Sequence, residues 1–387
     1  MTYNPHHGAP APTDSMSRLR ALTSAGQAVW LDFLDREFLK QGKLQQLIYD
    51  DGLTGVTSNP TIFEKAMAAS DAYDDALRVL AGGQRPTVEI YEHLVIEDVR
   101  NAAGILRSVY EQLDGRDGFV SLEVSPYIAH GTDATIEEAR RLWSAVDRPN
   151  LMVKIPATDA GISAISPLVT DGVNINVTLL FGVPEYQRVA EAYMSGLEAR
   201  LALNLPIDHV ASVASFFVSR VDAIIDEKLS HMRADAGSDA SIVKGKVGIA
   251  NAAAVYRAYR NLLESDRWRR LASHGARPQR LLWASTGVKN AEYRDVLYAE
   301  SLAAPDTVNT MALKTIDAFR DHGQATNVLT RDASTWDDVL RKADALGLDL
   351  PAVSRQLAND ALAAFVTSFD TLLKTLDTKV QRFKSIA

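Results

Sequence analysis

Three charged residues of the sequence lie where charged side chains are uncommon, at or near the ends of short apolar runs. They are Asp32, Glu123 and Lys154. Lysine is rarely buried without a partner, and burial favours the free amine, which can attack a carbonyl carbon. Carboxylates beside such an amine can transfer protons. If the three residues share one site, they predict an enzyme that forms a Schiff base on Lys154.

Each of these residues also has a simpler interpretation when it is taken alone. Lys154 could face water from an edge strand, and Asp32 or Glu123 could be a surface or capping carboxylate. The chemistry has an alternative too, because a lysine beside two carboxylates is compatible with a metal or enolate site. What favours the Schiff base is that three charged residues at equivalent strand positions are hard to explain as separate accidents.

Further polar residues accompany the other apolar runs. They are Asn59, Asn176, Thr178, Ser215, Arg220, Ser285 and Lys289. Asn176 and Thr178 are two residues apart, so in a strand they point to the same face and indicate a polar interior. Arg220 lies near an expected helix start, where a phosphate is favoured. The alternatives are a turn residue at Asn59, a structural amide at Asn176 and a surface arginine at Arg220.

Short β-branched or apolar runs alternate with amphipathic stretches along the chain, which is typical of an α/β protein. The predicted strands are Ala28–Phe33, Gly55–Ser58, Phe119–Ser125, Leu151–Pro156, Val173–Thr178, His209–Ser215, Arg280–Ser285 and Asp306–Asn309. The predicted helices include Val183–Leu203, Val218–Met232, Ala250–Leu263 and Tyr293–Ala303. This alternation predicts a (β/α)8 TIM barrel, in which catalytic groups lie at the carboxyl ends of the strands. A doubly wound open sheet is the alternative.

The ends of the chain differ from its centre. Residues 1–17, rich in proline and small polar residues, predict a flexible N-terminal tail. Residues 18–330 form the expected barrel domain, within which Gly237–Ser241 is the most loop-like stretch. Residues 331–387 predict a C-terminal helical extension packed on the barrel. Its helices are expected at Thr335–Leu346, Pro351–Ala358 and Asn359–Phe383.

The composition excludes several classes of protein. The chain has 387 residues, a net charge of −8 and no cysteine, which excludes disulfides, thiolate ligands and a cysteine nucleophile. The acidic balance argues against nucleic acid as a partner, and no run is long enough to span a membrane. The start of the chain lacks the plan of a signal peptide, so we expect a cytoplasmic protein. Nucleotide-loop and histidine metal motifs are absent, so we expect no metal ligands.

Seven ordered motifs, one for each of the first seven predicted strands, carry a resemblance to a known family. They are Trp30–Asp32, Gly55–Phe63, Val120–Pro126, Met152–Thr158, Asn174–Phe181, Ala214–Arg220 and Trp283–Asn290. On these motifs the chain closely resembles the transaldolases, in their longer bacterial branch. The resemblance implies a (β/α)8 barrel that uses a Schiff-base lysine and neither a metal nor an organic cofactor. We expect a monomer or a homodimer that acts on sugar phosphates.

The resemblance also implies a reaction. A dihydroxyacetone unit would pass from sedoheptulose 7-phosphate to glyceraldehyde 3-phosphate, giving erythrose 4-phosphate and fructose 6-phosphate in the non-oxidative pentose phosphate pathway. Lys154 would form the iminium with the ketose. Asp32 would take the proton of the C4 hydroxyl, and Glu123 with Thr178 would hold a water that shuttles protons.

The remaining residues would bind the substrate. The resemblance assigns the dihydroxyacetone hydroxyls to Asn59, Asn176 and Ser215. It assigns the phosphate to Arg220, which suits a bidentate contact. Some branches place a second arginine after the seventh strand, whereas this chain has Ser285 and Lys289 in the comparable loop. Either of these two residues could contact the phosphate.

Three rival functions remain. A fructose-6-phosphate aldolase of the same superfamily would release free dihydroxyacetone. The resemblance implies that those aldolases have a tyrosine at the position of Phe217 and a glutamine at the position of Glu123. These two residues therefore favour transfer over release. A binding protein without catalysis is not supported, because the chemical positions are intact. A metal-dependent aldolase would be revealed by sensitivity to a chelator.

Overall fold

The computed structural model describes residues 17–83, 85–232, 237–326, 328–331 and 333–384. Eight parallel strands close into a barrel in the order in which they occur in the chain, because β1 pairs with both β2 and β8. The strands are β1 (Gln27–Asp32), β2 (Gly55–Thr57), β3 (Phe119–Glu123), β4 (Leu151–Pro156), β5 (Ile175–Leu180), β6 (Ser212–Phe217), β7 (Arg280–Ala284) and β8 (Thr307–Met311). The predicted (β/α)8 TIM barrel is confirmed, and the open sheet is excluded.

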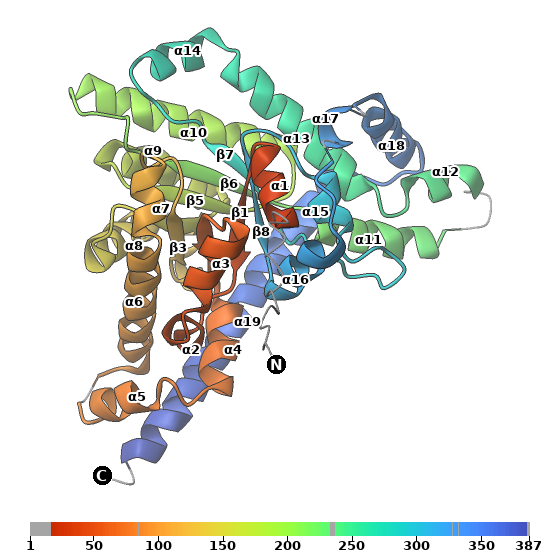
Figure 1. Cartoon of the computed structure of the whole chain (residues 1–387). Helices are drawn as coiled ribbons and strands as arrows, with labels where there is room; N and C mark the ends of the chain where they lie inside the picture. Colours follow the sequence, from red (N-terminus) through yellow and green to blue (C-terminus); the bar gives the residue numbers. More distant parts are fainter. Residues whose placement is uncertain (1–16, 84, 233–236, 327, 332, 385–387) are drawn as a thin grey trace, which may run out of the picture.

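Helices enclose the strands on the outside of the barrel (Figure 1). They are α1 (Arg18–Ser24), α2 (Arg36–Lys40), α3 (Lys43–Asp51), α4 (Pro60–Ala69), α5 (Asp74–Ala81), α6 (Thr87–Ile105), α7 (Arg107–Gln112), the short 3-10 helix η1 (Pro126–Ile128), α8 (Thr132–Val146), α9 (Asp159–Asp171), α10 (Val183–Ala202), α11 (Ser219–Ser230), α12 (Gly237–Val243), α13 (Val247–Leu263), α14 (Asp266–Ser273), α15 (Leu297–Ser301), α16 (Leu313–His322), α17 (Val328–Arg331), α18 (Ala333–Ala345) and α19 (Leu350–Lys384). Strands covered on both faces must be apolar nearly throughout, and every residue of β4, including Lys154, is buried.

Three sequence-based expectations about helices are wrong. Gly237–Ser241, expected as a loop, begins α12. The helix expected over Tyr293–Ala303 is limited to Leu297–Ser301, because Tyr293 lies in the preceding turns with its hydroxyl on Asp226. The last two expected helices are one helix, α19, because its buried stripe continues without a break. Residues 1–16 of the expected tail lie outside the described residues, while Ser17 caps α1.

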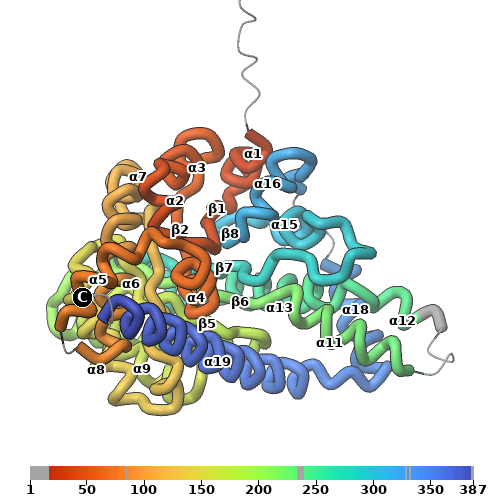
Figure 2. Tube along the Cα trace, turned by 90° about the horizontal axis from the view of Figure 1, so that it is seen from below, coloured from red at the N-terminus to blue at the C-terminus, as the bar shows by residue number. Residues whose placement is uncertain are grey.

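The last helix crosses the end of the barrel at which the strands terminate. α19 is 35 residues long and contacts α4, η1, β5 and α11 along its course. Figure 2 shows it, in blue, running across the molecule from α18 toward α5. The extension is therefore placed where it can take part in a site at the strand ends.

Among the described residues, no helix combines the length and apolar character needed to cross a membrane.

Gly55 lies against Trp30, its register partner in β1. A Cβ at Gly55 would approach the indole to 2.4 Å, and the indole is fixed because its Nε1 donates to Asp117 Oδ1 at 2.8 Å. We expect Gly55→Ala to lower the free energy of unfolding by about 1–3 kcal/mol, the usual cost of overpacking. Gly104→Ala is the matched control, because a Cβ at Gly104 meets nothing within 4 Å. Equal urea midpoints for the two variants would contradict this account.

Candidate active site

Lys154 lies at the centre of the carboxyl end of the barrel. Its Nζ donates to the Ser58 carbonyl oxygen at 3.1 Å and to Glu123 Oε2 at 3.3 Å. The side chains of Lys154 and Glu123 are 6% and 7% exposed. The pairing follows from the barrel register, in which Glu123 of β3 lies directly beside Lys154 of β4. The lysine is therefore a buried amine with a carboxylate at contact distance.

Asp32 is held at the end of β1 by Thr57 of the neighbouring strand β2, which in turn contacts Thr310 of β8. Thr57 Oγ1 donates to Asp32 Oδ1 at 2.8 Å and lies 2.7 Å from Thr310 Oγ1. The β1–β2 register places Thr57 beside Asp32. Asp32 and Lys154 both line one large cavity, so the amine and this carboxylate face the same space.

Burial raises the pKa of Asp32 above its ordinary value, although Lys154, the Thr57 hydrogen bond and Lys289 oppose this shift. Burial also raises the pKa of Glu123, against the influence of Lys154, while Asp32 adds to the rise. Carboxyl groups shifted in this direction lie closer to neutral pH. Both groups are therefore better suited to exchanging protons during a reaction than free carboxylates are.

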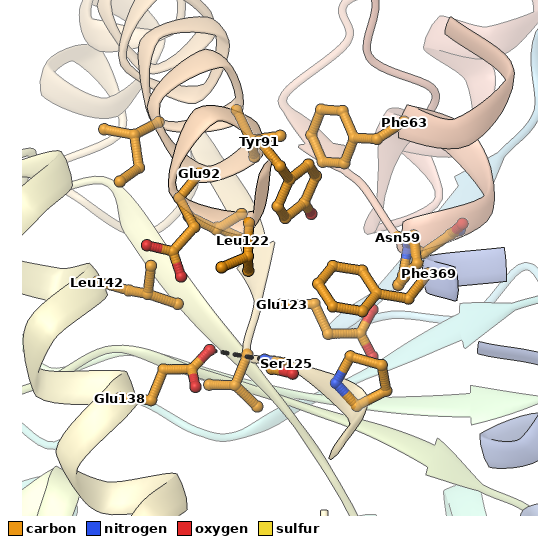
Figure 3. Close-up of a pocket in the computed structure, with 16 residues that line it drawn as sticks. Asn59, Phe63, Tyr91, Glu92, Leu122, Glu123, Ser125, Glu138, Leu142 and Phe369 are labelled. Atoms are coloured by element: carbon orange, nitrogen blue, oxygen red, sulfur yellow. Dashed lines mark hydrogen bonds between the residues drawn. The ribbon is translucent and has the colours of Figure 1, made fainter. Parts of the chain in front are cut away.

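A second, smaller cavity of about 40 Å³ lies behind Glu123, between α4, α6, α8 and α19. Figure 3 shows Glu123 at its edge with Asn59 and Phe369, while Tyr91, Phe63, Leu122 and Leu142 form the apolar wall. The Ser125 N–H donates to Glu138 Oε1 at 2.7 Å on the far side. These apolar side chains contribute to the burial that raises the pKa of Glu123.

Asn176 and Ser215 form a chain of hydrogen bonds across β3, β5 and β6. Ser215 Oγ donates to Asn176 Oδ1 at 2.6 Å, and Asn176 Nδ2 donates to Ser121 Oγ at 3.0 Å. Ser215 lines the large cavity, whereas Asn176 is fully buried beneath it. The Asn176 amide therefore orients Ser215. Because the Ser215 hydroxyl donates its hydrogen bond to Asn176, the lone pairs of Ser215 Oγ remain available to a ligand.

Thr178 lies at an irregularity of β5. The β5–β6 register shifts between Val177 and Leu180, and Leu179 has a left-handed backbone with φ of 64°. Such bulges re-aim side chains and occur at barrel rims near active sites. Thr178 lines the cavity, and its buried hydroxyl has no hydrogen-bond partner among the described residues. A buried hydroxyl in this position is suited to a water or substrate oxygen.

Asn59 caps a helix and also lies at the wall of the large cavity. Its Oδ1 accepts from the Ile62 N–H at 3.0 Å and caps α4, with Pro60 in the first turn. Asn59 also lines the large cavity. Because the cap uses only the oxygen, Nδ2 remains available as a donor to a ligand.

Positive charge collects on one side of the cavity. Arg220, Lys289 and Lys65 all line it, and none of them forms an ion pair with another described residue. Desolvation lowers the pKa of Arg220. Desolvation likewise lowers the pKa of Lys289, helped by Arg220 and opposed by Asp32. Cations gathered at one cavity without an ion-pair partner are suited to binding an anion.

The large cavity, of about 470 Å³, brings together the predicted residues except Glu123 and Asn176, which contact it through Lys154 and Ser215. Ser285 lines it with a left-handed backbone, φ of 54°, and lies 3.0 Å from Ser219 Oγ. Phe217 lines it as well, with Arg220 Cζ 5.7 Å from the centre of its ring. Among the described residues, no group of three or more His, Asp or Glu side chains is arranged to hold a metal ion.

Comparison with known proteins agrees with this geometry. The model of the family "Transaldolase/Fructose-6-phosphate aldolase" matches residues 29–376. This chain belongs to that family. It is 44% identical over 376 residues to "Transaldolase 2" of Nostoc sp. (strain PCC 7120 / SAG 25.82 / UTEX 2576), covering 95% of this chain and 98% of that protein. It is 46% identical over 356 residues to "Transaldolase" of Mycolicibacterium smegmatis, covering 92% of this chain and 95% of that protein.

Sequence reasoning missed several residues of this transaldolase/fructose-6-phosphate aldolase family site. They are Thr57, Ser58, Lys65, Ser121, Thr310 and Phe365. The period of two in a strand places Thr57 on the same face as Asn59, so Thr57 could have been found. Lys65 and Phe365 lie on helices, and no local pattern distinguishes them from surface or core residues.

Proposed function

We propose that this chain is a transaldolase, which transfers a dihydroxyacetone unit from sedoheptulose 7-phosphate to glyceraldehyde 3-phosphate. Erythrose 4-phosphate and fructose 6-phosphate are the products. The observation that carries the proposal is the buried Lys154 amine, 3.3 Å from Glu123 and in one cavity with Asp32. Relatives named transaldolase over nearly the whole chain support it.

Lys154 starts the reaction by attacking C2 of the ketose, which gives a carbinolamine. Loss of water from the carbinolamine then forms the iminium, and a proton must reach the departing hydroxyl. Glu123 supplies this proton through a water that is also bound by Thr178. The raised pKa of Glu123 and the unpartnered hydroxyl of Thr178 support these roles.

Asp32 acts in the cleavage step. It removes the proton of the C4 hydroxyl, C4 becomes the aldehyde carbon, and the electrons of the C3–C4 bond pass into the iminium to give an enamine. The acceptor aldehyde then reacts with the enamine, and Asp32 returns the proton to the new C4 oxygen. Thr57 supports this role, because its hydrogen bond fixes the carboxylate at the cavity wall.

The hydroxyls of the dihydroxyacetone unit are bound by Asn59 and Ser215. Asn59 Nδ2 is free to donate, and the lone pairs of Ser215 Oγ are free to accept. Asn176 acts through Ser215, which it orients. A donor and an acceptor on opposite sides of Lys154 suit a unit with a hydroxyl on each side of its carbonyl.

The phosphate is held by Arg220 and Lys289, and Lys65 and Ser285 line the same cavity. We expect Arg220→Ala and Lys289→Ala to raise KM for fructose 6-phosphate about 10- to 100-fold, because each removes a charge-assisted contact. We expect Lys65→Ala to raise it about 2- to 5-fold. Steady-state kinetics should compare fructose 6-phosphate with free fructose. Loss of a phosphate contact should raise KM only for the phosphorylated sugar, whereas general damage to the site would affect both. Lys314→Ala, at an exposed position of α16, is the control.

The rival within the family is an aldolase that releases dihydroxyacetone. Phe217 supports transfer, because its ring lines the cavity and brings no hydroxyl that could help to protonate the enamine. The test is fructose 6-phosphate given with and without erythrose 4-phosphate. A transaldolase turns over continuously only with the acceptor and stalls without it. Continuous release of dihydroxyacetone without acceptor would assign the chain to the aldolases.

The wider setting follows from this activity. We propose that the enzyme serves the non-oxidative pentose phosphate pathway in the cytoplasm as a monomer or a homodimer, with residues 18–330 as the catalytic domain and 331–387 as its helical extension. Light scattering after size-exclusion chromatography tests the oligomeric state, since a mass above that of a dimer would contradict it. Cell fractionation tests the location.

A further inference from the structure

The C-terminal helix brings an aromatic ring to the proposed nucleophile. Phe365 of α19 lines the large cavity and is 6% exposed. Lys154 Nζ lies over its ring, 5.8 Å from the ring centre. Lysine ammonium groups within about 6 Å of an aromatic face are attracted by the negative charge of that face. Besides the Ser58 carbonyl and the Glu123 carboxylate, Lys154 therefore has this ring as a neighbour.

The position of the ring is fixed by the residues one turn further along α19. Ser368 Oγ lies 2.8 Å from Thr61 Oγ1, next to the Asn59 cap. Phe369 packs edge-on against Tyr91 and Tyr127, with ring centres 5.3 Å apart in each pair. Figure 3 shows Phe369 beside Asn59 and Glu123. α19 is thus held to the elements that carry the catalytic groups, and Phe365 cannot withdraw without breaking these contacts.

We propose that Phe365 stabilises the positively charged iminium formed on Lys154, so that the C-terminal helix contributes a charge-stabilising side chain to the active site. This inference rests on the proposed Schiff-base function of Lys154. It adds a residue that lies 211 positions away in the sequence and carries no polar group.

The physical reason lies in the change of donors at the nitrogen. The ammonium form of Lys154 has three N–H donors for the Ser58 carbonyl and Glu123. The ammonium gives up a proton before the free amine attacks C2, and the neutral carbinolamine then loses its hydroxyl as water with the proton that Glu123 supplies. The C=N bond forms, one N–H remains, and the nitrogen carries a positive charge again. Hydrogen bonding to the nitrogen therefore weakens as the iminium forms. The attraction of an aromatic face depends on the charge and needs no N–H, so it persists.

The experiment replaces Phe365 by phenylalanine analogues with one, two and three ring fluorines. Fluorine withdraws charge from the ring face but changes the size of the side chain little. We expect the rate of borohydride-trapped adduct formation with fructose 6-phosphate to fall stepwise, by about 2- to 30-fold over the series. Phe365→Leu, which keeps an apolar side chain without a ring, is expected to lose a similar amount. Thermal unfolding checks that each variant is folded.

Phe383 provides the matched control, because it lies on the same helix with the Arg78 guanidinium 4.9 Å from its ring centre and does not line the large cavity. The same fluorinated analogues at position 383 should leave the adduct rate unchanged. A flat series at position 365, or equal falls at both positions, would mean that Phe365 only fills space and would overturn the inference. No adduct in the unsubstituted chain would instead overturn the Schiff-base function, and the inference with it.

Discussion

Replacement of Lys154 by methionine is expected to abolish transfer, lowering kcat by roughly four orders of magnitude or more, because the covalent nucleophile is lost. Methionine has nearly the length of lysine and fits the buried site. Lys154→Arg keeps the positive charge beside Glu123 but cannot form an imine. The two variants together therefore separate loss of charge from loss of the nucleophile, and both should be inactive.

The measurement combines a coupled assay for glyceraldehyde 3-phosphate with borohydride trapping and peptide mapping. The unsubstituted chain should carry a reduced sugar adduct on Lys154, and both variants should carry none. Lys314→Ala, at an exposed position, should behave as the unsubstituted chain does. An adduct spread over several surface lysines, or transfer that survives in Lys154→Met, would remove Lys154 from the mechanism. A loss of activity with a chelator would then bring back the metal-dependent rival.

Lys154→Met should also change how stability depends on pH. Lys154 is the main influence that opposes the rise in the pKa of Glu123, so without it that pKa rises further. A carboxyl group whose pKa is higher in the folded than in the unfolded state destabilises the fold as pH rises above the unfolded value. We therefore expect the variant to lose more stability than the unsubstituted chain as pH rises above the ordinary pKa of a glutamate, about 4.3, as judged by thermal unfolding. A constant difference between the two chains would contradict this.

Asp32→Asn is expected to leave Schiff-base formation intact and to slow cleavage by about 10²- to 10⁴-fold, the range attributed to a general base. Asparagine has the same shape and can still accept the hydrogen bond of Thr57. With fructose 6-phosphate, borohydride should therefore trap the intact six-carbon phosphate on Lys154. The unsubstituted chain should give mainly the three-carbon adduct, whose mass distinguishes the two cases.

The pH dependence supplies a second readout for Asp32. The cleavage step needs the carboxylate, and burial raises the pKa of Asp32. The rate of cleavage in the unsubstituted chain should therefore fall on the acid side at a pH above the ordinary pKa of aspartate, about 3.9.

Thr57→Ser keeps the hydroxyl that holds Asp32, whereas Thr57→Val removes it, and only the valine variant should slow cleavage. A three-carbon adduct formed at the normal rate in Asp32→Asn would exclude this role.

Much of the barrel could be predicted because its signals are local. β4 was predicted with its observed bounds, since a strand buried on both faces must be nearly all apolar. β5 and β6 were placed two and three residues too early at their starts, because the strand limits follow from pairing with neighbours rather than from their own residues. The division of α19 into two helices failed for a similar reason. Its continuous form depends on packing against α4, η1 and β5.

The sequence alone determined which residues could do the chemistry: a lysine, two carboxylates and a group of polar side chains, each at the end of an apolar run. These features can be predicted locally, because the burial of a strand and the alternation of its two faces depend on residues that are neighbours in the sequence. Only the tertiary structure decided that Lys154 contacts Glu123, that Thr57 holds Asp32, that a bulge re-aims Thr178, and that Phe365 reaches the active site from the last helix. These contacts join residues 25 to 211 positions apart, so they depend on barrel closure and on the path of α19, which no local stretch of sequence specifies.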